Sequence, residues 1–145
     1  MNYYERAQEL NEETIANRRY FHTNAEVGLD MPKAKAYVMK KLTEYGLEPK
    51  ECGYGVTATL GHGGKCIMLR ADMDALPMPE NNDLPFKTET DAAHNCGHDF
   101  HTAMLLCAAQ MLYEHRNELC GSVKLMFQPA EENFLGSKNM IENGI

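Results

Sequence analysis

Cys96 and His98 are the residues whose types and spacing most directly suggest chemistry. They lie in the stretch Asn95-Cys96-Gly97-His98-Asp99, where one glycine separates a thiol from an imidazole. In an extended backbone such residues point the same way, and Gly97 permits an unusual turn. Thiolate and imidazole suit a divalent transition metal, so the pair could contact one ion or two adjacent ions. For this short motif alone, a buried thiol beside a helix-capping histidine is the alternative.

Two neighbouring glutamates, Glu131 and Glu132, follow the apolar segment 122–127 and Pro129. Because neighbouring side chains point in different directions, one carboxylate could bind a metal while the other stands beside a hydrolytic water. A solvated surface pair is the alternative for these two residues taken alone.

Two aspartates, Asp72 and Asp74, follow the apolar segment 65–70. Open α/β sheets bind ligands beyond the carboxyl ends of their strands, so all four acids converge if segments 65–70 and 122–127 run parallel. Asp74 could hold a ligating imidazole by its free N–H, or it could be an ordinary turn residue. His101, three residues after His98, is either a neighbour of the site or a packing residue.

Helices and strands alternate around these motifs. Apolar periodicity and capping residues predict helices over residues 2–21, from Pro32 (capped by Asp30 or Met31) to Gly46, over 98–115 and over 136–143, with a short loop over 22–30. Strands are predicted over 55–60, 65–70 and 122–127, the first two forming a hairpin around the turn 61–64. Residues 72–95 read as a long loop. This order favours an α/β fold, a layered sheet with flanking helices.

The composition narrows the partners and the setting. The 145 residues carry a formal net charge of −7, with 43% hydrophobic and 24% charged residues, values ordinary for one globular domain. The negative charge disfavours nucleic acid and anionic membrane as partners, and no apolar stretch is long enough to span a bilayer. The five cysteines are irregularly spaced and no signal peptide opens the chain, so we expect free thiols and a cytoplasmic location.

Three motifs, in order, resemble one enzyme family. Arg70-Ala71-Asp72-Met73-Asp74-Ala75-Leu76-Pro77, Cys96-Gly97-His98-Asp99 and Phe127-Gln128-Pro129-Ala130-Glu131-Glu132 are similar to motifs of the aminoacylase/carboxypeptidase family of co-catalytic metallopeptidases. The similarity is greatest to the subgroup of hippurate hydrolase, N-acyl-amino-acid amidohydrolases and auxin-conjugate hydrolases. An early His-x-x-Pro-Glu pattern appears as His22-Thr23-Asn24-Ala25-Glu26, without the proline.

The resemblance implies a role for each candidate residue. Cys96 would bridge two divalent metal ions (Mn, Zn, Co or Ni), and His98 and Glu132 would each ligate one of them. Glu131 would be the general base that takes a proton from water and delivers it to the leaving amine. Asp74 would be the supporting catalytic aspartate.

Length distinguishes the chain from that family, whose members are more than twice as long. The resemblance implies that residues 1–145 are the amino-terminal portion of a zinc-peptidase-like catalytic domain, with the lid domain absent and two histidine ligands beyond Ile145. We expect a metal-dependent amidohydrolase that cleaves small N-acyl (N-acetyl or N-benzoyl) amino acids, and a homodimer is compatible with its full-length form. A non-catalytic metal-binding or interaction module and an inert fragment are the alternatives.

Overall fold

The chain forms a four-stranded sheet flanked by helices, and the computed structural model describes residues 2–145. The strands are β1 (Lys50–Cys52), β2 (Gly55–Gly61), β3 (Cys66–Asp72) and β4 (Ser122–Gln128). The helices are α1 (Tyr3–Glu9), α2 (Asn11–Thr23), α3 (Pro32–Glu44), α4 (His98–Glu114) and α5 (Leu135–Glu142), with a short 3₁₀ helix at Arg116–Glu118. The predicted α/β layered sheet is confirmed.

The strand order in the sheet is β1-β2-β4-β3. β2 pairs antiparallel with β1 and with β4, whereas β3 and β4 run parallel. In the parallel pair Asp72 lies opposite Gln128, so β3 and β4 end together. Parallel neighbours need a crossover connection, and α4 supplies it here.

The predicted hairpin between residues 55–60 and 65–70 is wrong, because β4 lies between β2 and β3. A short turn can still join them, since two strand spacings amount to only about 10 Å. Burial explains the order: Leu125 and Phe127 of β4 are fully buried, whereas Ile67 and Met68 of β3 are more than half exposed. The more buried strand therefore takes an interior position and β3 lies at the edge.

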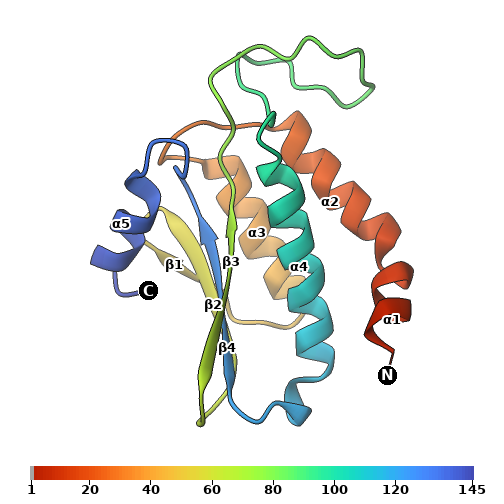
Figure 1. Cartoon of the computed structure of the whole chain (residues 1–145), viewed down its shortest axis with the longest axis vertical. Helices are drawn as coiled ribbons and strands as arrows, with labels where there is room; N and C mark the ends of the chain where they lie inside the picture. Colours follow the sequence, from red (N-terminus) through yellow and green to blue (C-terminus); the bar gives the residue numbers. More distant parts are fainter. Residues whose placement is uncertain (1) are drawn as a thin grey trace.

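Helices α3 and α4 cover one face of the sheet, α2 packs against α4, and α5 lies on the other face (Figure 1). The main core lies between the sheet and α3 and α4, and Val38, Val56 and Leu106 are fully buried in it. A smaller cluster that includes Met126 and Met140 joins α5 to the opposite face.

The helix ends differ in detail from the expectations. The predicted helix over 2–21 is two helices that meet at Leu10, and α2 continues to Thr23, so His22 is helical rather than part of a loop. α3 begins at Pro32 as expected and ends in a Schellman motif, with Gly46 at φ 93° and a 2.9 Å hydrogen bond from Leu47 N to the Leu42 carbonyl. The three-residue strand β1 was not predicted.

The long loop of residues 73–97 stands beyond the carboxyl ends of β3 and β4 (Figure 1). Paired hydrogen bonds between Leu76 and Ala93 close its base. No helix among residues 2–145 is long and apolar enough to cross a membrane. The five cysteines are all free thiols.

Candidate metal centre

The acids that follow β3 and β4 meet at one edge of the sheet, as expected for parallel strands. Because Asp72 is paired with Gln128, the residues just beyond them arrive side by side. The amino end of α4 starts at His98 next to the same edge. One ligand atom each from Cys96, His98 and Glu132 lies within 4.8 Å of the others. The structure thus brings together three residues that the sequence singled out as possible metal ligands.

Asp74 holds the two glutamates by their backbone. Its two carboxylate oxygens accept hydrogen bonds from the backbone N–H groups of Glu131 (2.9 Å) and Glu132 (3.1 Å). Burial raises the pKa of Asp74, but hydrogen bonds from His98 and from these amides outweigh burial and hold that pKa below its ordinary value. An ionised Asp74 therefore fixes the loop that carries both glutamates.

The same loop contains a strained residue. Ala130, directly before Glu131, has φ 48°, a left-handed conformation that costs a residue with a Cβ roughly 1 kcal/mol. Strained conformations persist where surrounding contacts over-determine them, and the hydrogen bonds to Asp74 are such contacts. The backbone thus turns sharply enough to aim the two glutamates back toward α4.

His98 presents one ring nitrogen to these acids. Its Nδ1 lies 2.9 Å from the backbone carbonyl oxygen of Asp74, so Nδ1 must donate. Its Nε2 faces Asp72 Oδ1 at 3.6 Å, Glu131 Oε2 at 3.6 Å and Glu132 Oε1 at 3.8 Å. These separations exceed hydrogen-bond length and leave room for a cation bound by the Nε2 lone pair.

The cluster carries excess negative charge. Burial lowers the pKa of His98, but Asp74 and Asp72 outweigh it and raise that pKa to about 9. The pKa of the Cys96 thiol is also raised, first by its contact with Glu132, then by burial and by the charges of Glu131 and Asp72. Without a competing cation, the acids keep both potential ligands protonated at neutral pH.

The residues present fit a divalent transition metal. Glu132 Oε1 is buried and has no hydrogen-bond partner within residues 2–145. A buried carboxylate oxygen without a partner is unfavourable, and a cation would satisfy it. The donors are one nitrogen, one sulfur and one carboxylate oxygen, the set that zinc and similar ions prefer. A bound cation would also reverse the raised pKa of the thiol.

The Glu131 carboxylate differs from that of Glu132 in its hydrogen bonding and its access to solvent. Its carboxylate makes no hydrogen bond to any residue in the described part of the chain, and its side chain is 33% exposed. It lines a surface groove of about 440 Å³ together with Arg70 and Phe134. A carboxylate that is close to the candidate ligands yet open to solvent can accept a proton from water.

Asp72 belongs to a second group beside the first. Its Oδ1 accepts a 2.6 Å hydrogen bond from His101 Nδ1, and its Oδ2 pairs with Arg70 at 2.9 Å. Asp72, His98 and His101 also place ligand atoms within 4.8 Å of one another. His101 is therefore a neighbour of the site rather than a packing residue. The contribution of Arg70 was not predicted, although residues 70 and 72 share one face of β3 by strand alternation.

The sequence matches one protein family and, among others, two named relatives. Residues 68–145 match the family described as Peptidase family M20/M25/M40. The chain is 40% identical over 140 residues to the N-acetyl-L-cysteine deacetylase of Bacillus subtilis (strain 168), covering 93% of this chain and 34% of that protein. It is 44% identical over 133 residues to the hippurate hydrolase of Campylobacter jejuni, covering 88% of this chain and 34% of that protein. The chain thus spans about a third of the length of these relatives.

Solved structures show the same fold. A putative aminohydrolase from methicillin-resistant Staphylococcus aureus superposes with a TM-score of 0.91 at 34% identity, over 97% of this chain and 38% of that one. The Bacillus subtilis YXEP protein, described as a dinuclear metal-binding peptidase of the M20 family, superposes with a TM-score of 0.90 at 34% identity, over 94% of this chain and 40% of that one. By sequence and by fold, this chain belongs to peptidase family M20/M25/M40.

Proposed function

We propose that this chain is the amino-terminal part of a metal-dependent amidohydrolase that cleaves the amide bond of small N-acyl amino acids. Cys96, His98 and Glu132 would be among the residues that hold its divalent transition-metal ions. When bound, such ions polarise the substrate carbonyl and lower the pKa of water. The observation that carries the proposal is the buried Glu132 Oε1, which has no hydrogen-bond partner within residues 2–145 and lies 3.8 Å from Nε2 of His98.

Glu131 would act as the general base. Its carboxylate takes a proton from the water that attacks the substrate carbonyl carbon, and it delivers that proton to the amine nitrogen as the C–N bond breaks. The hydrogen bond from its backbone N–H to Asp74 would keep it in place during both transfers. Asp74 would act by positioning, because backbone amides already occupy both of its oxygens.

The names of the relatives support the substrate class. The two curated relatives are named for the removal of an acetyl group from N-acetyl-L-cysteine and for the hydrolysis of hippurate, which is an N-acyl amino acid. The acidic cluster around His98 disfavours an anionic group unless a cation is bound, which agrees with a metal-dependent reaction.

A chimaera tests the proposal, because this chain covers only a third of the relatives. Residues 1–145 would replace the matching segment of the Bacillus subtilis deacetylase, and turnover of N-acetyl and N-benzoyl amino acids would be measured. Glu131→Gln should lower kcat at least a hundredfold while metal content, measured by elemental analysis, stays the same. Glu142→Gln, on the exposed side of α5, is the matched control. Normal turnover by the Glu131→Gln chimaera would refute the role of Glu131.

A metal-binding interaction module is the second candidate for the chain by itself. The edge strand β3 exposes Ile67 and Met68, and such an apolar edge can recruit a complementary chain. This candidate predicts that the isolated chain binds metal but does not hydrolyse N-acyl amino acids. Measurable turnover by the isolated chain would exclude it.

A further inference from the structure

A second cluster of buried charges lies outside the metal centre. We call Arg18, His22, Glu80 and Asp99 the ion cluster. His22 Nδ1 lies 2.8 Å from Asp99 Oδ2, and His22 Nε2 lies 2.8 Å from Glu80 Oε1. Arg18 Nε lies 2.7 Å from Asp99 Oδ2. The side chains of His22, Glu80 and Asp99 are 6%, 1% and 0% exposed, so water cannot replace these partners.

The contacts define the chemistry of His22. A carboxylate can only accept, so two short contacts to carboxylates require the ring to donate from both nitrogens. Arg18 also approaches Nδ1, at 3.3 Å, but the 2.8 Å contact with Asp99 is shorter and decides the donor. His22 then has no lone pair for a metal. The ion cluster sets two basic side chains against two carboxylates, and each carboxylate lies within 2.8 Å of a basic nitrogen, although Arg18 Nε makes no directed hydrogen bond within residues 2–145.

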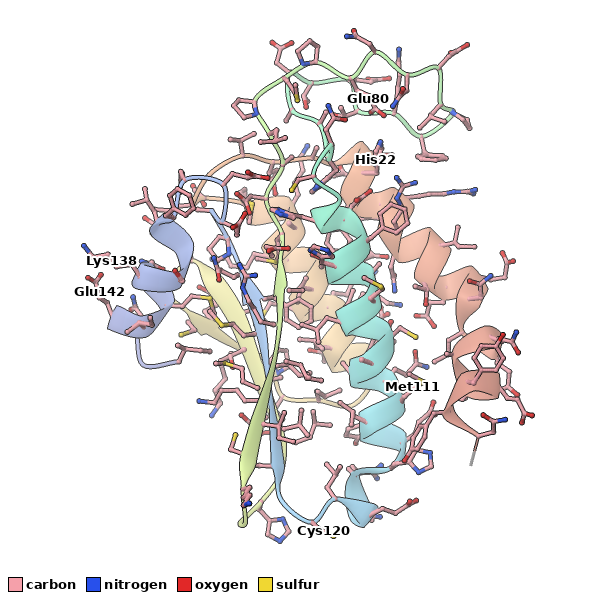
Figure 2. The ribbon with its side chains drawn as sticks, in the orientation of Figure 1. His22, Glu80, Met111, Cys120, Lys138 and Glu142 are labelled. Atoms are coloured by element: carbon pink, nitrogen blue, oxygen red, sulfur yellow. The ribbon has the colours of Figure 1, made fainter. Side chains whose placement is uncertain are left out.

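The ion cluster joins α2 to two segments that carry residues of the metal centre. Arg18 and His22 belong to α2, Glu80 belongs to the 73–97 loop, and Asp99 lies in the first turn of α4, next to His98. Figure 2 shows His22 beneath the part of the loop that carries Glu80.

Further contacts secure the loop and shield Arg18. Glu80 Oε2 accepts a 2.9 Å hydrogen bond from the backbone N–H of Thr88. The Arg18 guanidinium lies over the rings of Phe86 (5.2 Å) and Phe100 (4.4 Å). The loop is thus held at its middle as well as at its base.

The position of Cys96 depends on the neighbouring loop and helix more than the position of His98 does. His98 is 2% exposed and anchored to Asp74, whereas Cys96 is exposed and is followed by Gly97 at φ 93°, a residue with wide backbone freedom. The packing of Cys96 itself therefore does little to fix its thiol. Its position follows from the loop on one side and from the first turn of α4 on the other.

We propose that the ion cluster is a latch that sets the spacing between Cys96 and His98, with His22 as a positioning residue for the metal centre. This inference rests on the proposed function, because it takes Cys96 and His98 as ligands. Its specific consequence is that loss of the latch weakens the thiolate contact before it weakens the imidazole contact.

Cobalt binding to the reduced 145-residue chain tests the latch without any assay of activity. Co²⁺ bound to a thiolate gives a charge-transfer absorption that reports the Cys96 contact, and titration gives the Kd. His22→Gln, which can pair with only one of the two carboxylates, should weaken the Kd about tenfold or more and reduce the charge-transfer absorption per bound ion. His62→Gln, in the exposed turn 61–64, makes the same chemical change and should alter neither quantity.

Two more variants separate positioning from general destabilisation. Glu80→Gln keeps an oxygen acceptor for His22 but removes the charge, so it should show the same loss in weaker form and serves if His22→Gln does not fold. Val38→Ala creates a cavity in the main core, away from the loop, and should lower the melting temperature while leaving the charge-transfer absorption per ion unchanged.

Each contrary result has a distinct meaning. An unchanged Kd and absorption in both His22→Gln and Glu80→Gln would overturn the latch, and so would an equal loss in Val38→Ala. Absence of the charge-transfer absorption in the unaltered protein would instead overturn the proposed metal centre, and the latch with it.

Discussion

The metal centre and the ion cluster are two groups of ionisable side chains, and they differ in how the charges are paired. The ion cluster balances Arg18 and His22 against Glu80 and Asp99. Around His98 the acids outnumber the bases, its Nε2 lies 3.6–3.8 Å from three carboxylates, and Glu132 Oε1 has no hydrogen-bond partner in the described chain. Buried charges that lie against opposite charges rigidify the surrounding structure, whereas a cluster with an excess of one sign of charge favours a bound counter-ion. The difference separates a structural cluster from the proposed metal site.

Removing a ligand should show this difference most strongly. Cys96→Ala should weaken Co²⁺ affinity by at least about a hundredfold, more than the loss of an outer-shell partner. Because Cys96 is exposed, the melting temperature measured in chelator should barely change. An affinity within a few-fold of the unaltered protein would place the cation elsewhere.

Asp74→Asn should lower both the stability of the fold and the affinity for metal. An asparagine amide can accept from only one of the two backbone N–H groups of Glu131 and Glu132, and its NH₂ group would face the other donor. We expect a loss of about 2 kcal/mol in the free energy of unfolding, measured by urea denaturation, together with weaker metal binding. Unchanged stability would show that Asp74 does not hold the glutamate loop.

The pH dependence should have opposite signs with and without metal. The folded pKa of His98 is raised from 6.5 to about 9, so its contribution to stability is fully present below pH 6.5 and is lost as the pH rises toward 9. Metal must displace that proton, so affinity should rise about tenfold per pH unit for each proton released up to that range. Thermal melting in chelator and Co²⁺ titration between pH 6.5 and 9 would check both slopes, and slopes of the same sign would contradict the assignment of His98.

A surface ion pair should show the smallest effect. Lys138 and Glu142 on α5 are 4.0 Å apart and 73% and 62% exposed (Figure 2). Solvent screens such pairs, so Lys138→Gln should change the free energy of unfolding by less than about 0.5 kcal/mol in urea denaturation. A larger change would mean that burial is not what distinguishes the ion cluster from the rest of the charged surface.

Local pattern was sufficient for most of the elements and for the candidate ligands. The helix starting at Pro32 and the apolar strands around residues 55–60 and 122–127 follow from capping residues and periodicity. Cys96, His98 and the Glu131–Glu132 pair could be singled out because they stand in short motifs beside such elements, whereas the choice of Glu132 as the ligand came from the family resemblance. Strand β1 was not predicted because three residues are too few to show an alternating pattern. The break between α1 and α2 at Leu10 was not predicted because no glycine or proline marks it.

Long-range pairing could not be predicted in the same way. The partners of His22 lie 58 and 77 residues away, and its sequence surroundings indicated a loop. The short turn between residues 55–60 and 65–70 predicted a hairpin, but β4 lies between those two strands in the sheet.

The amino-acid sequence by itself determined which side chains could do chemistry and which segments are helical or extended, because capping, periodicity and donor type are local properties. Only the tertiary structure decided that β3 and β4 end together, that Asp74 binds the backbone of both glutamates, and that His22 lies between two acids. These outcomes depend on which buried surfaces and charges pair with residues far along the chain. The free energy of those long-range contacts is gained only when the helices pack on the sheet.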